Sequence, residues 1–302
     1  MEIGYWKLVH VPVLLHEAIT LLDPKPNECF VDATLGAGGY AKEILARTAP
    51  QGKLFAVDLD ENAVAHFERY ITATEWAPRV IVQQGNFADL PELMGQNHFP
   101  RADGLIADLG FSSDQIEASG RGFTFLKDEP LLMAYDIHSS CTAAAIVNGY
   151  TEKELGELIQ RYSNERYAAR IAKNIVVRRK ARKIITTKEL VDIIIRSVPE
   201  RYERGRIHPA TRTFLALRIA VNNELENLTR LLARLEAIVK PGGRVAIISF
   251  QSLEDKLVKD AFRQKQKEGR FVAMTKKPLI PGEEEIRNNS RARSAKLRVA
   301  RI

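Results

Sequence analysis

"FVDATLGAGGY", residues 30–40, joins a short apolar strand to an acid and then to a glycine-rich turn where a helix should begin. Residues 36–41 satisfy the pattern G-x-G-x-x-G/A of dinucleotide-binding turns. Glycines let the backbone approach a ligand closely, and the helix N-terminus that follows offers free N–H groups. The stretch predicts a turn that holds a nucleotide-like ligand, although a tight turn without a ligand uses the same residues.

Four apolar, β-rich runs occupy the first part of the chain, and helical patterns at 40–48 and 61–71 separate the first three. The runs are residues 29–34, 53–60, 79–87 and 102–111. Near-continuous apolar strands that alternate with helices indicate a parallel sheet covered on both faces. The next strand, 243–250, follows only after about 130 residues, far more than a crossover needs. The runs at 270–279 and 294–302 predict an antiparallel pair at the sheet edge.

The long gap between strands predicts an insertion. We expect an α/β domain formed by residues 1–112 and 207–302, interrupted by a helical, basic domain at 113–206. In the insertion, residues 162–183 place apolar side chains on one helix face and arginines on another, and Thr186 or Thr187 begins a second helix.

After the insertion, Pro209 opens a long helix. Its buried stripe recurs at three- and four-residue steps from Phe214 to Leu235, and "KPGG" at 240–243 ends it.

Composition is that of an ordinary globular protein. The 302 residues are 45% hydrophobic and 27% charged, and no apolar run approaches the roughly 18 residues of a membrane helix. The N-terminal residues lack the pattern of an export signal, so we expect a cytoplasmic protein without a membrane partner. Cys29 and Cys141 are far apart and the six histidines show no ligand spacing, so we expect neither a disulfide framework nor a metal site.

Positive charge is concentrated in two segments. Residues 161–206 carry +9 and residues 287–302 carry +6, so the rest of the chain, within a total of +7, carries −8. A mildly acidic body with two basic segments indicates a polyanionic partner such as nucleic acid, the alternative being two solvated basic faces.

The ligand of the glycine turn is either NAD or S-adenosylmethionine. Asp58 ends the second strand, 22 residues after Gly36, where an acid accepts hydrogen bonds from the ribose of either cofactor. Gly85, Asn86 and Phe87 follow the third strand, where they can contact an adenine. The strand at 243–250 followed by two edge strands is typical of class I methyltransferases, and no second mononucleotide half for NAD is visible. The sequence therefore favours S-adenosylmethionine.

Eight motifs in order carry a resemblance to a known family. They are "HVPVLLHEAI", "DATLGAGGY", "ADLGFSS", "RGFTF", "YSNERYAARIAKNIV", "HPATRTFLALRIAVNNEL", "PGGRVAIISFQSLED" and "RARSAKLR". Together they resemble the RsmH (MraW) family of ribosomal RNA small subunit methyltransferases, from about residue 10 to the C-terminus. The resemblance implies S-adenosylmethionine-dependent methylation of N(4) of a cytidine in the decoding region of small-subunit (16S) rRNA, within free rRNA or the assembled small subunit. It also implies a class I methyltransferase fold: Rossmann-like α/β, with a mostly parallel seven-stranded sheet and an inserted helical substrate-recognition domain.

The resemblance also assigns residues to the cofactor. The implied contacts are Gly38, Gly39, Tyr40, Asp58, Phe87, Asp108 and Gln115. Asp32 is left outside this set, as an acid that braces the turn.

Methyl transfer to a cytidine amine needs in-line attack on the sulfonium methyl group and a target base splayed out of its RNA. Asp108, Ser112 and Ser113 follow the fourth strand, at the edge where ligands of such sheets bind. We take Asp108 and Ser113 as the catalytic candidates and leave the base unassigned. The expected RNA contacts are Arg166, His208, Arg212 and Asn222, with a helix cap as the alternative role of His208.

Three departures from the family pattern lie near the expected cleft. Tyr40 and Gln251 stand where the family usually has histidine, and Ala134 where it usually has arginine. They motivate an alternative: an RNA- or ribosome-binding assembly factor, or a diverged paralogue, with weak or altered activity. A third hypothesis, an NAD-dependent oxidoreductase, rests on the glycine turn alone. The sequence does not decide between a monomer and a homodimer.

Overall fold

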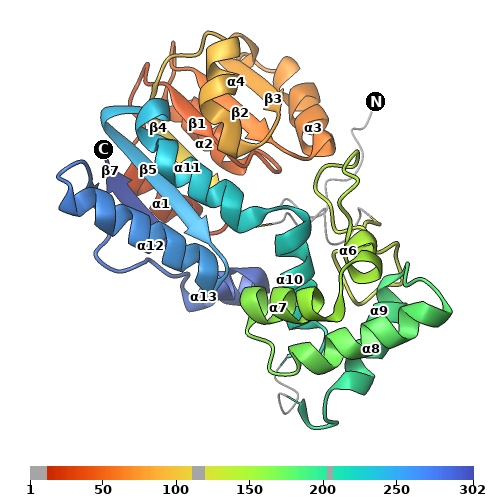
Figure 1. Cartoon of the computed structure of the whole chain (residues 1–302). Helices are drawn as coiled ribbons and strands as arrows, with labels where there is room; N and C mark the ends of the chain where they lie inside the picture. The colour runs from red at the N-terminus through yellow and green to blue at the C-terminus, as the bar shows by residue number, and fades with distance from the viewer. Residues whose placement is uncertain (1–11, 111–119, 203–206) are drawn as a thin grey trace. The chain divides into compact units, whose positions relative to one another are not determined.

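The structure, a computed structural model, describes residues 12–110, 120–202 and 207–302. The chain divides into two compact units, one formed by Met1–Gly110 with Leu225–Ile302 and the other by Phe111–Glu224 (Figure 1). The second division therefore falls at 224/225, not at the expected 206/207. The cause is helix α10 (Thr211–Val221), which packs against α7 (Glu152–Ser163) and α6 (Ala143–Gly149) of the inserted unit.

One seven-stranded sheet forms the centre of the first unit. Its strands are β1 (Phe30–Asp32), β2 (Leu54–Asp58), β3 (Val80–Gln84), β4 (Ala102–Asp108), β5 (Val239–Ser249), β6 (Val272–Ala273) and β7 (Lys296–Arg301). The spatial order is β3-β2-β1-β4-β5-β7-β6. The first five strands in this order are parallel, whereas β7 runs antiparallel to both β5 and β6. The mostly parallel sheet with an antiparallel edge is confirmed.

Helices cover both faces of this sheet. They are α1 (Leu15–Leu22), α2 (Gly39–Arg47), α3 (Glu61–Thr72), α4 (Leu90–Gln96), α11 (Glu224–Ile238) and α12 (Ser252–Lys267). The unit also contains α13 (Glu283–Asn288), which buries none of its residues, and the short 3-10 turns η1 (Ala77–Arg79), η2 (Phe87–Asp89) and η4 (Ser290–Ser294). Successive strand residues point to opposite faces. Phe30 and Leu54 accordingly enter one core with α1, α2 and α3, while Val31 and Phe55 enter the other with α4, α11 and α12.

The second unit is helical and has its own core. Besides α6, α7 and α10 it contains α8 (Ala168–Ala181) and α9 (Thr187–Ser197). On α8, Ile171 and Ile175 are buried while Arg170 and Lys173 are exposed, which confirms the two-faced helix. Thr186 is the cap of α9, because its side chain accepts a hydrogen bond from the Glu189 N–H.

The single long helix expected after Pro209 is wrong. The chain leaves the helix at Asn222 and Asn223, and Asn223 has a φ of 50°, in the left-handed region that ends helices. Phe214 therefore enters the core of the second unit, whereas Leu235 on α11 enters a core of the first. The "KPGG" stretch also differs from expectation, since it lies within β5.

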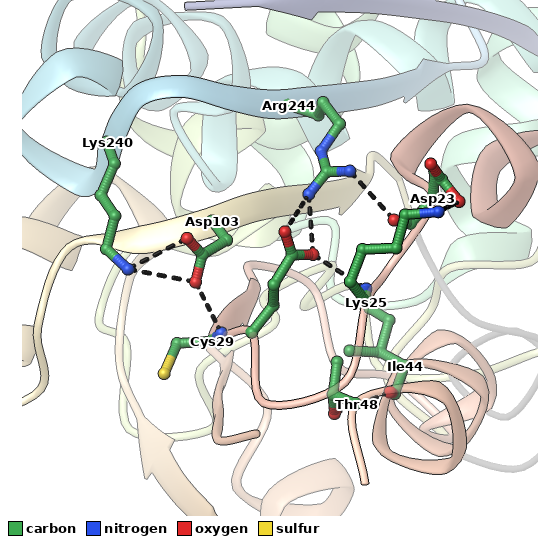
Figure 2. A network of polar contacts seen from close by, with 9 residues as sticks. Asp23, Lys25, Cys29, Ile44, Thr48, Asp103, Lys240 and Arg244 are labelled. Carbon is green, nitrogen blue, oxygen red and sulfur yellow. Dashed lines mark hydrogen bonds and ion pairs between the residues drawn. The ribbon is translucent and has the colours of Figure 1, made fainter. Parts of the chain in front are cut away.

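Ion pairs pin the sheet at the amino-terminal ends of its parallel strands (Figure 2). Asp103 pairs with Lys240 at 3.0 Å and accepts a hydrogen bond from the Cys29 N–H at 2.8 Å. Arg244 pairs with Glu28 at 2.7 Å. Partly exposed pairs of this kind contribute at most about 1 kcal/mol each. Their main effect is to hold the amino-terminal ends of β1, β4 and β5 together, whereas the candidate site lies at the carboxyl ends of the strands.

Within the described residues, no helix has both the length and the apolar character that a membrane span requires.

Candidate functional site

The turn after β1 depends on its glycines. Gly36 and Gly38 have φ values of 50° and 74°, which favour glycine. A Cβ at Gly38 would lie 2.2 Å from the Phe67 ring, and one at Gly39 would lie 2.1 Å from the Pro12 ring. Packing within the unit thus already requires both glycines. A Cβ at Gly36 would approach its nearest neighbour only to 4.0 Å, so Gly36 presents the more open backbone.

Three carboxylates stand at the carboxyl ends of three adjacent strands. Asp58 ends β2, Asp32 ends β1 and Asp108 ends β4, and β1 lies between the other two strands in the sheet. In the register of the sheet Asp32 is level with Ala56 and Ile106, so Asp58 and Asp108 both lie two residues further along. The topology therefore gathers three acids beside the glycine turn.

Asp58 braces the glycine turn. One carboxylate oxygen accepts a hydrogen bond from the Gly36 N–H at 2.8 Å, and the other accepts one from the Asp60 N–H at 2.9 Å. Burial raises the pKa of Asp58 to about 6, against these two hydrogen bonds. Each oxygen keeps a second lone pair, so the carboxylate can also accept bonds from a ligand's hydroxyl groups.

Asp32 and Asp108 each have a buried oxygen without a hydrogen-bond partner in the described structure. The other oxygen of Asp32 accepts a bond from the Thr34 N–H at 3.2 Å. Burial, followed by the charge of nearby Asp58, raises the pKa of Asp32 to about 7. Burial and the charges of Asp32 and Glu254 raise the pKa of Asp108 well above its usual range. A buried oxygen without a partner is costly, so each of these two marks a place where a ligand group would be stabilised.

This arrangement suits a ligand that carries positive charge. A cation beside the cluster would stabilise the ionised carboxylates, whereas the pyrophosphate of a dinucleotide would be repelled by them. Within the described residues, no group of three or more histidine, cysteine or acidic side chains is placed to hold a metal ion.

Phe87 begins η2, directly after β3. Asn86 begins this turn by accepting a hydrogen bond from the Ala88 N–H at 2.9 Å, and the Gly85 N–H bonds the Asp58 carbonyl at 2.9 Å. The Phe87 ring is half-buried against the core. The structure therefore brings Phe87 to the strand end beside Asp58, as the sequence predicts, and its contact with an adenine stays a prediction.

Tyr40 lies in the first turn of α2 with its ring in the core. Its hydroxyl donates a hydrogen bond to the Val13 carbonyl, and burial raises its pKa well above the usual value. The polar group of Tyr40 is thus engaged within the protein. If Tyr40 contacts the cofactor, as predicted, it does so through its backbone atoms, because its hydroxyl is engaged by Val13.

The β5–α12 turn carries Gln251. Glu254 is buried and accepts hydrogen bonds from the Phe250 N–H at 3.0 Å and from the Gln251 N–H at 3.3 Å. The Gln251 side-chain amide donates to the other Glu254 oxygen at 3.3 Å. Gln251 therefore helps to fix the start of α12 at the carboxyl end of β5.

Two of the expected RNA contacts are arginines of the second unit. Arg166 is exposed, and its guanidinium lies 5.7 Å from the Tyr202 ring centroid. Arg212 is half-buried and reaches the Asn164 carbonyl at 3.5 Å. Both positions leave cationic groups at the surface of this unit.

His208 and Asn222 have structural partners. His208 stacks on Phe125 with ring centroids 4.6 Å apart, and its Nδ1 accepts a hydrogen bond from the Ala210 N–H at 3.2 Å in the turn before α10, whose N-cap is Ala210 and not His208. Asn222 is buried: its amide donates to the Met133 carbonyl at 2.8 Å and accepts from the Tyr135 N–H at 2.8 Å. The side chain of Asn222 is thus engaged within its own unit, and its RNA contact stays a prediction.

Ser112, Ser113 and Gln115 lie outside the described residues, so their assignments stay predictions.

Sequence reasoning missed Asp32 and a buried ion pair. Asp32 was visible as the acid directly before the turn, but nothing in the sequence shows that one of its oxygens lacks a partner. Arg218 pairs with Glu224 at 2.8 Å, and both side chains are about 10% exposed. The Tyr135 hydroxyl bonds Glu224 at 3.2 Å. This cluster forms where α10 ends. The sequence does not indicate that end, because the apolar pattern continues from α10 into α11.

Comparisons with known proteins extend over almost the whole chain. The model of the MraW methylase family matches residues 7–302. Three relatives carry the name ribosomal RNA small subunit methyltransferase H. The protein of Syntrophobacter fumaroxidans is 42% identical over 96% of this chain and 95% of its own length. The protein of Clostridioides difficile is 40% identical over 96% of this chain and 98% of its own length. The protein of Desulfotalea psychrophila is 43% identical over 97% of this chain and 97% of its own length. With the sheet order and the carboxylate cluster described above, this similarity shows that the chain belongs to the MraW methylase family.

Proposed function

We propose that this protein transfers the methyl group of S-adenosylmethionine to N(4) of a cytidine in the decoding region of small-subunit rRNA. The observation that carries the proposal is the full-length similarity to small-subunit rRNA methyltransferases, 42% identical over 96% of the chain in one case. The proposal includes the cytoplasm as the place of action and the rRNA, free or in the assembled small subunit, as the partner. A homodimer stays a prediction.

The carboxylate cluster supports the cofactor. S-adenosylmethionine brings a sulfonium methyl donor and an α-ammonium group, both cationic. The unpartnered oxygens of Asp32 and Asp108 and the open backbone at Gly36 fit such a ligand. Asp58 would accept the ribose hydroxyls while its bond to the Gly36 N–H holds the turn in place. Phe87 would border the adenine.

The residues of the chain would act mainly by alignment. The lone pair of a cytidine amine is delocalised into the ring, so the amine needs a hydrogen-bond acceptor that orients it as it is methylated. Asp108 stands at the end of β4 with a buried oxygen that has no partner in the described parts of the chain, and we assign it this positioning of the amine. Ser113, which follows the same strand, stays a predicted second candidate for this role.

The three departures from the family pattern are accommodated by local structure. Tyr40 bonds the Val13 carbonyl, Gln251 bonds Glu254, and Ala134 is buried in the core of the second unit. None of these contacts removes a member of the carboxylate cluster. They therefore favour an active enzyme over an assembly factor without turnover.

Mass spectrometry of rRNA nucleosides from a deletion strain tests the proposal. We expect N(4)-methylation of the target cytidine to disappear, to return with the wild-type gene and to stay absent with Asp108→Asn. Unchanged N(4)-methylation in the deletion strain would contradict the proposed function. Full restoration by Asp108→Asn would remove Asp108 from the mechanism but leave the function standing.

A further inference from the structure

A cavity of about 360 Å³ opens in the first unit, beyond the carboxyl end of β5. Its lining comes from the β5–α12 turn, from the segment before α13, from α13 itself, from η4 and from the start of β7. Among its lining residues are Phe250, Gln251, Ile280, Pro281, Arg293 and Lys296. The volume lies within the range of about 300–1,000 Å³ that is typical of small-ligand sites.

The charge of the lining suits an anion. Arg293 and Lys296 both line the cavity, and the described lining residues include no carboxylate. Lys296 is held by Asp255 at 3.3 Å, but Arg298 already pairs with the same carboxylate at 2.7 Å, so the ammonium charge is only partly cancelled. Glu254 and Asp255 occupy the first turn of the 16-residue helix α12, so the cationic character of the lining comes from Arg293 and Lys296.

Apolar surface stands beside these cations. Phe250, Ile280 and Pro281 line the same cavity, and Ile280 is 68% exposed. A flat aromatic base gains from stacking and apolar contact, while its phosphate is held by arginine and lysine. A nucleotide combines the two features that this lining offers.

The cavity adjoins the strand end that carries Asp108. In the β4–β5 pair Asp108 is level with Ile248, and Phe250 follows two residues later. The Phe250 ring lies 3.6 Å from where a Cβ of Gly110 would stand. A nucleotide bound here would therefore be close to the base positioned by Asp108.

We propose that this cavity binds a nucleotide of the substrate RNA that neighbours the target cytidine, with Arg293 and Lys296 on its phosphate and Phe250 and Ile280 against its base. The inference rests on the proposed function, since it adds a subsite for the same RNA.

The test compares Arg293→Gln with Arg301→Gln. The two substitutions remove the same charge from exposed residues of the basic C-terminal segment. Arg301, however, is level with Arg244 at the amino-terminal part of β5, at the other end of β7 from Lys296. Binding of small ribosomal subunits and of a fluorescein-labelled, cytidine-containing RNA is titrated for both variants, together with methylation kinetics. We expect Arg293→Gln to raise Kd and KM roughly tenfold with kcat nearly unchanged, and Arg301→Gln to change Kd and KM less than about twofold.

Photo-crosslinking identifies the occupant. RNA with 4-thiouridine next to the target cytidine should crosslink to peptides that contain Phe250 or Ile280, and the crosslink should be lost in Ile280→Asp. Equal effects of Arg293→Gln and Arg301→Gln, or crosslinks that map elsewhere, would overturn the inference while leaving methylation by the wild type intact. A wild type that fails to methylate RNA but binds it in an Arg293-dependent way would overturn the proposed function and keep the subsite. An Arg293-dependent contact with a ribosomal protein instead of RNA would overturn the inference as well.

Discussion

At the scale of single residues, the site is defined by buried acids at the ends of adjacent strands. Asp58 accepts hydrogen bonds from two backbone N–H groups, whereas Asp32 and Asp108 each keep a buried oxygen that has no partner among the described residues. Burying a carboxylate in this way costs free energy, and a cationic ligand offsets that cost on binding. The cluster therefore links cofactor binding to protonation.

Asp58→Ala should weaken binding of S-adenosylmethionine by roughly 1.5–3 kcal/mol, the range for hydrogen bonds that involve a charged partner. The substitution also removes the brace on the Gly36 N–H, so the loss should lie toward the upper end. Calorimetric titration measures the change. Asp103→Asn is the control, because it removes a carboxylate charge at the opposite edge of the sheet and should leave the affinity unchanged. An unchanged Kd for Asp58→Ala would mean that the ribose binds elsewhere.

Affinity for S-adenosylmethionine should rise with pH between about 5.5 and 8. The pKa values of Asp58 and Asp32 are raised to about 6 and about 7, so both are partly protonated in this window and must lose protons to face a cation. Stability of the free protein changes in the opposite direction. Since the native pKa of Asp32 exceeds the unfolded value, its contribution to the stability of the free protein is present at low pH and is lost as pH rises through about 7, on the order of 4 kcal/mol in all.

Titration in buffers of different ionisation enthalpy at pH 6.5 measures the protons released on binding. We expect net release for the wild type and less for Asp32→Asn. S-adenosylhomocysteine, which lacks the sulfonium charge, should release fewer protons than S-adenosylmethionine. Proton uptake on binding, or equal release by both ligands, would contradict the assignment of the cluster to the cation.

At the scale of elements, the β5–α12 turn and helix α8 carry polar side chains whose roles in catalysis and RNA binding can be tested. The turn places Gln251 where the family usually has histidine, and the contacts of Gln251 are with Glu254. On α8 the basic side chains differ from one another. Arg179 donates to the Val147 carbonyl at 2.7 Å and is half-buried, whereas Arg178 and Lys180 are exposed.

Gln251→His should change the methylation rate by less than about tenfold, or about 1.4 kcal/mol of barrier. An amide orients a base by hydrogen bonds as an imidazole does, and the proton of the methylated amine can leave to solvent. Single-turnover methylation of small subunits across pH 6–9 compares the two proteins. A large increase in the methylation rate of Gln251→His, with a new pH step near 6.5, would show instead that the family's histidine transfers a proton and that the wild-type chain lacks this catalytic group.

Arg178, Lys180 and Lys183 changed together to glutamine should weaken RNA binding and lower its salt dependence, because fewer counterions are released. All three side chains are exposed. Affinity for S-adenosylmethionine should hardly change. Arg179→Gln serves as the contrast, since it should lower thermal stability more than RNA affinity. If the triple variant keeps the wild-type salt slope, this face of α8 is a solvated surface.

At the scale of the whole molecule, much of the sheet could be predicted from the sequence. The inserted helical unit between β4 and β5 could be predicted only in part, because its second boundary could not. Near-continuous apolar runs such as "LFAVD" have one physical explanation, a strand buried on both faces, so strands and their parallel order follow from the sequence. The break at Asn222 and Asn223 could not be predicted. The apolar period continues across it, and only the tertiary contacts of Asn222 with Met133 and Tyr135 show that the chain turns there.

The candidate site shows the same division. Asp58 and Asp108 could be placed at strand ends from spacing alone, because parallel strands bring their carboxyl ends to one edge. The engagement of Tyr40 by Val13 and of Asn222 by neighbouring backbone groups depends on burial, which spacing does not give.

The central claim is that this chain methylates cytidine N(4) in small-subunit rRNA. The most direct test incubates the purified protein with small ribosomal subunits from the deletion strain and with S-adenosylmethionine labelled in its methyl group, followed by mass spectrometry of the rRNA nucleosides. We expect label in N(4)-methylcytidine at one position, and none when Asp108→Asn replaces the wild type. Absence of label with the wild-type protein, or label in a different nucleoside, would contradict this claim.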